Sequence, residues 1–308
     1  MPWLTMLSED YRHRHAQAAL LSIEVRCSII PVLQQSNRET RRGYTLNDLM
    51  SGSPEEIRAL VRRGELTRPT AGLAPGYAQA NLVVLPEDLA FDFFLFCQRN
   101  PGPCPVLEVV ESGRYEPSLT ARGADLRVDI PLYRIYRDGE LVAEERDVTG
   151  YWDDDLVCFL LGCSFTFEAA LIRAGIRLRH IEQGKNVAMY VTSIEARPAG
   201  MFSGPIVVSM RPIHEPKVVR CVQITSRFPM AHGAPLHIGN PAKMGIRNIE
   251  HPDYGDYVEI KEDEVPVFWA CGVTAQAAAL RSRPRLMITH SPGHMFITDV
   301  RDEELAAS

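Results

Sequence analysis

Two cysteines stand where a predicted strand meets a predicted helix, a position in which a thiol can take part in chemistry. Cys271 follows the apolar run VPVFWA and precedes Gly272 and a helix that begins near Thr274. Backbone N–H groups at the start of a helix lower the pKa of a nearby thiol and can equally hold a substrate carboxylate. Cys163 lies in GCSFTFE, where Gly162 permits a sharp bend. The alternative for each cysteine is a small buried hydrophobic group, the commonest state of a free thiol.

Histidines in two loop segments are candidates for acid–base chemistry. His232 and His237 lie in MAHGAPLH, and His290 and His294 lie in THSPGH. A histidine that follows a strand is well placed to transfer protons, so His232 and His290 are candidate catalytic residues. The H-x4-H and H-x3-H spacings fall short of a recognised metal signature, so the sequence predicts no metal site. The alternative is that the imidazoles bond loop carbonyls, which fits His237 and His294.

Other polar residues have the chemistry to hold a small charged substrate. Glu168 is a candidate base or a partner for an ammonium group, and Arg211 could pair with a carboxylate through two nitrogen atoms. The segment that begins at Thr67 combines glycines with neutral donors and lacks a P-loop lysine, so it suits a zwitterion or a carboxylate better than a phosphate. The candidate binding residues are Thr70, Gly72, Gly76, Tyr77, Gln79, Asn81, Glu168, Arg211, Gly272 and Thr274. The alternatives are that the segment from Thr67 is a turn-rich structural loop and that Arg211 is an ordinary surface arginine.

The elements around these residues alternate between strand and helix. Ser53 is a predicted N-cap, with Pro54 at the first helical position, for a helix that runs to about Arg63. NLVVLP, EDLAFDFFLFCQRN and CPVLEVVES then have the patterns of strand, helix and strand, and this order returns after Val265. The order predicts an α/β layer with a parallel sheet, closed by both ends of the chain.

The middle of the chain predicts a second, smaller unit. Asp138-Gly139 is a hairpin turn signal. The segment DDDLVCFLLGCSFTFEAALIRAGI is predicted to be helical on both sides of a break near Gly162. NVAMYVTSIEA, GPIVVSMRPI and VVRCVQITSRF are predicted strands separated by turns. One helical unit with three strands predicts an inserted α+β domain at residues 151–228.

With 308 residues, of which 45% are hydrophobic, the chain is long enough for two domains. The main α/β domain is predicted to comprise residues 50–150 and 229–308. Residues 1–49 carry none of the loop motifs and are interpreted as an N-terminal extension outside the core. Met50 is a candidate start codon on the same interpretation.

The composition limits which classes of binding partner and which cellular compartment are expected. The net charge is -6, with acids and bases interspersed, which argues against a nucleic-acid partner. No apolar stretch reaches the roughly 18 to 20 residues that span a bilayer, and the N-terminus lacks a signal-peptide pattern, so no membrane partner is expected. Seven cysteines without CxxC pairs fit reduced, buried thiols and a cytoplasmic location. A small molecule is the predicted partner, and homo-oligomer formation stays open.

The same segments resemble the D-glutamate cyclase family, a family of hydro-lyases. PTAGLAPGYAQANLV, FLLGCSF, HGAPLHIG, VPVFWACGVT and THSPGHM are similar to that family in order, from about Glu55 to Asp299. The resemblance implies an α/β fold in which a three-layer α/β/α domain carries an inserted two-layer α+β domain. It implies a hydro-lyase of amino acid metabolism that closes D-glutamate to 5-oxo-D-proline with loss of water and uses no cofactor.

Such a reaction needs a base, an oxyanion site and an acid in one place. His232 or His290 could serve as base and acid in turn, and Cys271 or Cys163 could donate a proton or form a thioester. The α-carboxylate would bind backbone N–H groups of the loop at 70–76 or of the helix start at Gly272, oriented by Gln79 or Asn81. Two alternatives stay open, a two-cysteine amino-acid racemase or epimerase and a non-catalytic small-molecule binding domain.

Overall fold

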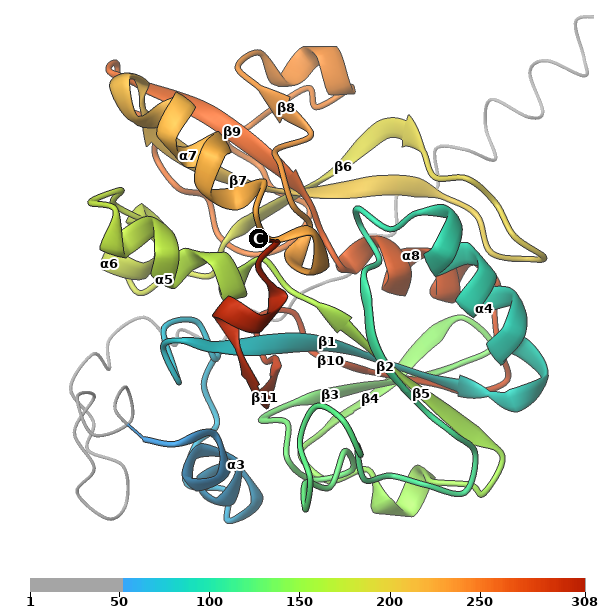
Figure 1. The fold of residues 1–308 in the computed structure, drawn as a ribbon. Helices are drawn as coiled ribbons and strands as arrows, with labels where there is room; N and C mark the ends of the chain where they lie inside the picture. The colour runs from blue at the N-terminus through green and yellow to red at the C-terminus, as the bar shows by residue number, and fades with distance from the viewer. Residues whose placement is uncertain (1–51, 308) are drawn as a thin grey trace, which may run out of the picture. The chain divides into compact units, whose positions relative to one another are not determined.

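The computed structural model describes residues 52–307, which all fall within one compact unit of the chain. They form a mixed α/β fold with two antiparallel sheets and six α-helices (Figure 1). The predictions for residues 1–49 and for Met50 lie outside the described residues. The helices are α3 (Pro54–Arg62), α4 (Glu87–Arg99), α5 (Phe165–Arg173), α6 (Arg179–Glu182), α7 (Val218–Thr225) and α8 (Val273–Arg281). Short 3-10 helices span Thr149–Tyr151 (η1), Glu215–Lys217 (η2), Pro229–Ala231 (η3), Pro241–Met244 (η4) and Asp302–Leu305 (η5).

The larger sheet has seven strands in the order β2-β5-β1-β10-β3-β4, with β11 also paired to β1. Its strands are β1 (Tyr77–Pro86), β2 (Val106–Val110), β3 (Tyr133–Arg137), β4 (Glu140–Glu145), β5 (Leu156–Gly162), β10 (Met287–His290) and β11 (Phe296–Arg301). Strand β1 is central and is registered with β5 from Ala80↔Gly162 to Pro86↔Leu156. The sheet therefore has β1 at its centre, with the end of β5 beside Ala80.

The predicted parallel sheet is wrong, because every strand pairing within residues 52–307 is antiparallel. The strand, helix, strand order of β1, α4 and β2 was predicted correctly. Strand β5 lies between β1 and β2 and runs against both, so these two strands point the same way without pairing. The order of elements along the chain correctly predicted that α4 connects β1 to β2. It could not show that β5 lies between these two strands.

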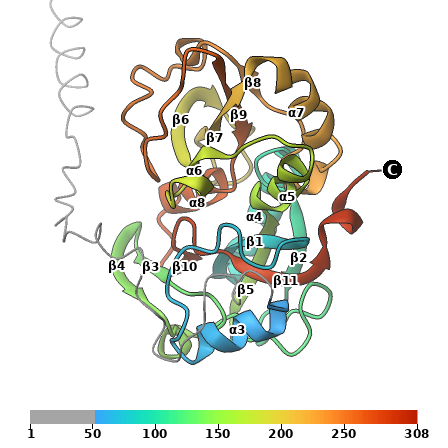
Figure 2. The same ribbon diagram turned by 90° about the vertical axis from the view of Figure 1, so that its left-hand side faces the viewer.

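The smaller sheet has four strands in the order β6-β7-β9-β8. These are β6 (Ala188–Glu195), β7 (Pro205–His214), β8 (His237–Ile238) and β9 (Glu264–Ala270). Helix α8 follows β9 directly and leads to β10, so it connects the smaller sheet to the larger one (Figure 2). Because β5 belongs to the larger sheet and β9 to the smaller one, strand membership does not follow the boundaries at 151 and 228. The inserted domain and the three-layer arrangement stay predictions.

Local sequence signals place several elements where they were predicted. Ser53 caps α3: its hydroxyl accepts from the Glu56 N–H at 3.2 Å, and its own N–H donates to the Glu56 carboxylate at 2.8 Å. This reciprocal capping box satisfies two backbone N–H groups that the helix start leaves without partners. Asp138 and Gly139 turn β3 into β4 with φ values of 51° and 84°, which Asp and Gly tolerate. The predicted helix start and hairpin are confirmed.

Two segments have a different secondary structure from the one predicted. The first half of the predicted broken helix is strand β5, all seven residues of which are buried. A strand buried on both faces has no polar alternation, so its apolar run matches a buried helix equally well. The predicted strand VVRCVQITSRF contains helix α7, whose buried residues Cys221, Ile224 and Thr225 recur at helical spacing. Its β-branched residues favoured a strand, and tertiary packing decided otherwise.

The larger sheet is buried on both faces: helices α4 and α8 pack against β1, and helix α3 packs against β11. Along β1, Leu82 and Val84 point into a cluster closed by the loop residues Leu126 and Ile130. The residues between them point into a second cluster, which contains Phe93 and Phe96 of α4 and alanines of α8.

None of the helices within residues 52–307 is long and apolar enough to cross a membrane.

Candidate active site

Asn81 on β1 connects the two strand-to-helix turns that carry the candidate cysteines. Its side-chain amide donates to the Gly162 carbonyl at 2.8 Å, immediately before Cys163. A Cβ atom on Gly272 would lie 2.3 Å from Asn81 Nδ2, so glycine after Cys271 is what permits this approach. The turn after β5 and the turn after β9 therefore meet at one side chain of the central strand.

The remaining loop segments join the same region through backbone contacts. The Thr70 N–H donates to the Gly293 carbonyl at 2.8 Å, which ties the first loop to THSPGH. A Cβ on Gly162 would lie 1.7 Å from the Met230 carbonyl oxygen, which places MAHGAPLH against the end of β5. Segments that are up to 223 residues apart in sequence thus surround β1.

The two cysteines share one buried apolar cluster with Met189, Val207 and Met295. The Cys271 sulfur lies 3.7 Å from the Met189 sulfur. Burial raises the pKa of the Cys163 thiol to about 12 and also raises the pKa of Cys271, although backbone N–H groups at the helix starts oppose the shift. Both thiols are therefore neutral at neutral pH, which disfavours a thiolate nucleophile. Their catalytic roles stay predictions.

Both candidate catalytic histidines are buried and held by the protein. The Leu82 N–H donates to His290 Nδ1 at 3.0 Å, and burial lowers the pKa of His290 to about 3. His232 has a left-handed backbone with φ 75°, and its Nδ1 lies 2.8 Å from the Gly102 carbonyl oxygen. Burial lowers the pKa of His232 to about 4, so each imidazole is neutral at neutral pH.

His237 and His294 fit the structural alternative. His237 Nε2 lies 2.9 Å from the Asn240 carbonyl oxygen, and His294 Nδ1 lies 3.3 Å from that of Pro292. These are the loop-carbonyl contacts expected of imidazoles that stabilise a turn. The structure thus gives these two histidines a local role.

Glu168 and Arg211 form a buried ionic cluster with His180. Arg211, on β7, is fully buried; its Nε donates to Glu168 Oε1 at 2.9 Å and one Nη donates to the Ser164 hydroxyl at 2.9 Å. His180 Nε2 lies 3.1 Å from the same Glu168 oxygen. Burial acts to raise the pKa of Glu168, but the charges and hydrogen bonds of His180 and Arg211 outweigh it and hold the pKa low. Glu168 is therefore ionised, and Arg211 is engaged within the protein.

The cluster borders a cavity of about 240 Å³ between the first loop and α5. Glu168 lines this cavity, and its Oε2 atom has no hydrogen-bond partner among residues 52–307. Because an unpaired buried carboxylate oxygen is costly, this atom requires a ligand or a solvent molecule. The complete lining comprises Gly72, Leu73, Ala74, Pro75, Gly76, Tyr77, Gln79, Phe165, Glu168, Ala169, Ile172, Arg173, Ile181 and Asp302.

Five of the candidate binding residues line this cavity, and the other five do not. Thr70 donates its hydroxyl to Gln79 Oε1 at 2.8 Å, and the Gln79 amide donates back to the Thr70 carbonyl at 3.0 Å, so this pair fixes the loop. The Thr274 hydroxyl accepts from the Val207 N–H at 2.9 Å. The candidates at the cavity wall are Gly72, Gly76, Tyr77, Gln79 and Glu168. The candidates outside the lining are Thr70, Asn81, Cys163, Arg211, His232, Cys271, Gly272, Thr274 and His290.

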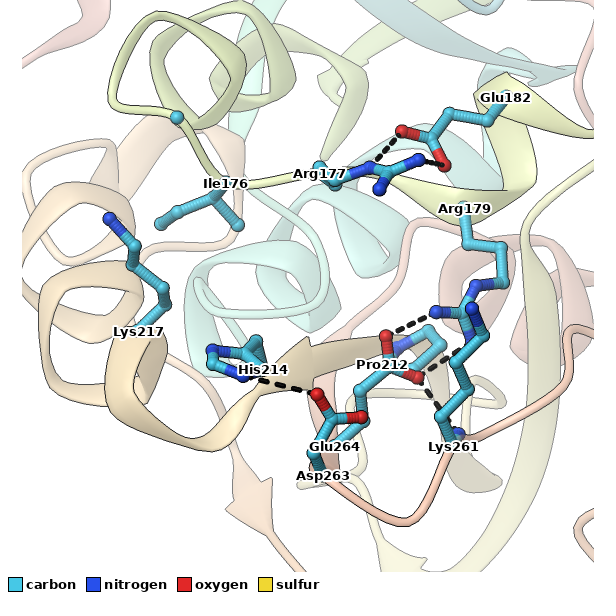
Figure 3. A pocket seen from close by; sticks show the side chains of 11 residues that line it. Ile176, Arg177, Arg179, Glu182, Pro212, His214, Lys217, Lys261, Asp263 and Glu264 are labelled. Carbon is cyan, nitrogen blue, oxygen red and sulfur yellow. Dashed lines mark hydrogen bonds and ion pairs between the residues drawn. The ribbon is translucent and has the colours of Figure 1, made fainter.

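A second cavity, of about 270 Å³, is lined by charged residues that pair with one another (Figure 3). Arg177 donates to Glu182 at 2.7 Å, Arg179 pairs with Glu264, and His214 lies 3.1 Å from Asp263. None of the candidate catalytic or binding residues lines it. The cavity beside Glu168 is therefore the candidate active site.

Several curated bacterial proteins are similar to this chain over most of their length. "Putative hydro-lyase Teth514_1597" of Thermoanaerobacter sp. (strain X514) is 64% identical over 253 residues, which cover 82% of this chain and 96% of that protein. "Putative hydro-lyase YcsI" of Bacillus subtilis (strain 168) is 61% identical and covers 82% and 99%. The model of the D-glutamate cyclase family matches residues 157–299. The chain belongs to the D-glutamate cyclase family.

A weaker structural similarity adds nothing to this assignment. A nitrogen repressor-like protein from Methanococcus jannaschii aligns with a TM-score of 0.35 and 8% identity, over 79% of this chain and 97% of that chain. Similarity at this level establishes neither fold nor function. The resemblance to the D-glutamate cyclase family seen in the loop motifs is confirmed by the family model together with the sequence relatives.

The segment that matches the D-glutamate cyclase family contains Glu168 and Arg211, but not the loop from Gly72 to Tyr77. It also ends before Asp302, a cavity residue that the sequence did not identify. Asp302 lies in VRDEEL, a charged run that has the pattern of a solvent-exposed face. His180 was missed for the same reason, since it lies in RLRHIE, a segment in which four of the six residues are charged or polar. No local signal marks either side chain as buried.

Proposed function

We propose that this protein is a hydro-lyase that acts on a small acidic amino acid and closes D-glutamate to 5-oxo-D-proline with loss of water. Membership of the D-glutamate cyclase family and relatives named as hydro-lyases support the reaction class. The structural observation that carries the proposal is Glu168, an ionised carboxylate at the wall of the cavity whose Oε2 atom has no hydrogen-bond partner among residues 52–307. Such an oxygen complements the ammonium group of an amino acid. The proposal includes a small-molecule partner and a cytoplasmic location.

The reaction joins the α-amine nitrogen to the side-chain carboxyl carbon and breaks one carbon–oxygen bond. The nitrogen loses two protons and the departing oxygen gains two, so the site must provide for proton transfer. Glu168 would orient the amine, since an anchored nitrogen near the carboxyl carbon replaces a random encounter. Backbone N–H groups of the loop at Gly72 and Gly76 would bind a substrate carboxylate.

Proton NMR of the purified protein in deuterated water tests the proposal. With D-glutamate, we expect the substrate signals to be replaced by those of 5-oxo-D-proline, while L-glutamate and a panel of small amino and hydroxy acids serve as controls. Exchange of the Cα proton without ring closure would favour the racemase instead. If D-glutamate and the panel stay unchanged at high protein concentration, the hydro-lyase proposal fails and the binding-domain alternative gains support.

The two cysteines give a second test, because the sequence predicts thiol chemistry at one of them although neither lines the cavity beside Glu168. Cys163→Ala and Cys271→Ala should differ: the catalytic one loses turnover and still binds ligand, and the other keeps most activity. Turnover by NMR and ligand-induced thermal stabilisation measure the two properties separately. Each variant deletes one sulfur atom from the same apolar cluster, so each is the structural control for the other. Full activity in both variants would exclude thiol chemistry.

A further inference from the structure

Asp302 is a buried carboxyl that faces the same cavity as Glu168. It is 2% exposed, begins η5, and its Oδ1 atom has no hydrogen-bond partner within the described part of the chain. Its backbone N–H donates to the Gly76 carbonyl at 3.0 Å, which fixes the residue against the first loop. Burial raises the pKa of Asp302 to about 7, partly offset by Arg173. The cavity thus has two orphaned carboxyl oxygens, one on each of two elements.

The environments of the two carboxyls separate their protonation states. Arg211 and His180 hold Glu168 ionised, whereas at Asp302 burial outweighs the charges of Arg173 and Arg301, so this carboxyl keeps its proton up to about neutral pH. A pair of carboxyls whose pKa values are driven apart is the usual arrangement of an acid and its charged partner. The groups around Asp302 are Tyr77 of β1, Arg173 and Glu168 of α5, Arg301 of β11, and Glu303 and Glu304 of its own turn.

Arg173 completes the chemistry of the cavity wall. It lines the cavity, and no carboxylate among residues 52–307 forms an ion pair or hydrogen bond with its guanidinium. The wall therefore offers one ionised carboxylate, one guanidinium and one neutral carboxyl. Glutamate carries the complements of all three, which are an ammonium group, an α-carboxylate and a second carboxylate.

We propose that Asp302 is a catalytic proton-transfer residue of this site, which binds a dicarboxylic amino acid with its ammonium on Glu168, its α-carboxylate on Arg173 and its side-chain carboxylate on Asp302. The inference rests on the proposed function and assigns the second acid of that reaction.

With Asp302 as the proton-transfer residue, every proton that moves during ring closure is accounted for. Protonated Asp302 donates to the side-chain carboxylate, whose carbon then becomes electrophilic. Asp302 then takes one proton from the substrate ammonium, which gives the nitrogen a lone pair, and the free amine attacks so that the carbon–nitrogen bond forms. A second transfer through Asp302 carries the other nitrogen proton to the departing oxygen, and the carbon–oxygen bond breaks to give water. The nitrogen has lost two protons, the water oxygen has gained two, and Asp302 ends as it began.

Asp302→Asn tests the assignment, with Glu303→Gln as the matched control. Glu303 is the exposed neighbour in the same turn, so its variant removes a carboxyl from η5 outside the cavity lining. We expect Asp302→Asn to lower kcat by about 100-fold or more, the scale of general acid–base catalysis, with a smaller change in KM. Glu303→Gln should stay within twofold. In the wild type, kcat/KM should fall as the pH rises through about 7, where Asp302 loses its proton, and Asp302→Asn should lack this fall.

A carbon-13 NMR titration of protein labelled at the aspartate side-chain carboxyls separates this inference from the proposed function. One resonance should titrate near pH 7, be absent in Asp302→Asn and move when D-glutamate is added to the wild type. If no aspartate titrates near pH 7, or if Asp302→Asn keeps its kcat within threefold, the inference is wrong. If D-glutamate moves the resonance without being turned over, the proposed function fails while Asp302 stands as a binding residue for the side-chain carboxyl. If it neither moves the resonance nor is turned over, both fail.

Discussion

Replacing Arg211 with methionine is expected to lower the free energy of unfolding by about 3 to 5 kcal/mol, the cost typical of removing one partner from a buried ion pair. Arg211 has no exposed surface, and its guanidinium contacts Glu168, Ser164 and Ser209 while lying over the rings of Phe167 and Trp269. Methionine fills much of the same volume but donates no hydrogen bond. Among residues 52–307, Glu168 Oε1 then keeps His180 Nε2 as a polar neighbour at 3.1 Å, and part of the lost stability comes from a buried carboxylate without its guanidinium partner.

Urea denaturation of three variants separates the stability lost with the Arg211 contacts from the stability lost because the Glu168 carboxylate is left without its partner. The double variant Arg211→Met with Glu168→Gln should recover part of the stability, because no buried charge remains. Arg177→Met is the surface control: Arg177 pairs with Glu182 but is 83% exposed, so no measurable change is expected. Equal stability of the Arg211→Met and Arg177→Met proteins would show that the buried cluster does not hold the fold together.

The elements predicted correctly are those whose ends are marked by local capping or turn residues. Ser53 and Glu56 cap α3 within four residues of sequence, and Asp138-Gly139 adopts the positive φ values that its turn requires. Both signals depend on neighbours in sequence, so they are visible without the fold. The candidate loops were identified for a similar reason, since glycines and polar residues interrupt apolar runs at strand ends.

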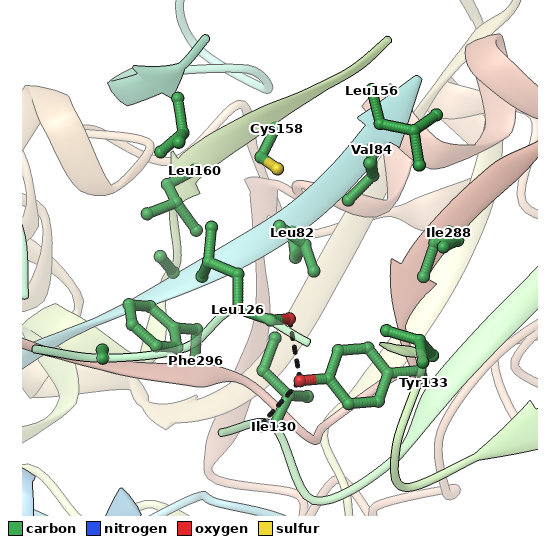
Figure 4. Close-up of a cluster of buried hydrophobic side chains, with 14 of the residues drawn as sticks. Leu82, Val84, Leu126, Ile130, Tyr133, Leu156, Cys158, Leu160, Ile288 and Phe296 are labelled. Atoms are coloured by element: carbon green, nitrogen blue, oxygen red, sulfur yellow. Dashed lines mark hydrogen bonds between the residues drawn. The ribbon is translucent and has the colours of Figure 1, made fainter. Parts of the chain in front are cut away.

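Strand β5 shows where periodicity stops being informative. Leu156, Cys158 and Leu160 point into one apolar cluster (Figure 4), and Val157 and Phe159 point into the cluster on the opposite face. Every position is therefore apolar, and the period of two that marks a half-buried strand is absent. Three acids before the run had the pattern of a first helical turn, although they precede the strand.

The active-site cavity could be predicted only in part, because burial and pairing are long-range properties. Glu168 and Arg211 were both identified as candidates, but their contact joins residues 43 apart, and the sequence predicted a separate substrate partner for each of them. Asp302 is buried by the first loop and α5, more than 120 residues away in the chain. A charged segment near the end of the chain has no local feature that distinguishes its one buried carboxyl from its exposed neighbours.

The second large effect is expected at Gly162, where alanine should lower the free energy of unfolding by about 3 kcal/mol or more, at the upper end of overpacking costs. The sequence attributed this glycine to a sharp bend, but its φ is not in the left-handed region. The requirement is instead steric: a Cβ would lie 1.7 Å from the Met230 carbonyl oxygen and 2.8 Å from its carbon. These are backbone atoms of η3, which cannot move aside as a flexible side chain can.

Gly162 is also held from its other side, since its N–H donates to the Pro105 carbonyl at 2.8 Å and its carbonyl accepts from Asn81. The strand end is therefore fixed on both sides, and the added methyl must displace the MAHGAPLH loop or break the contact with Asn81. Gly150→Ala is the matched control, because its Cβ would meet nothing within 4 Å and its φ is permitted. Thermal unfolding should show a large loss for the first variant and little change for the second. If Gly162→Ala melts like Gly150→Ala, the close approach of η3 to β5 is not a feature of the folded protein, and the loop that carries His232 is positioned by other contacts.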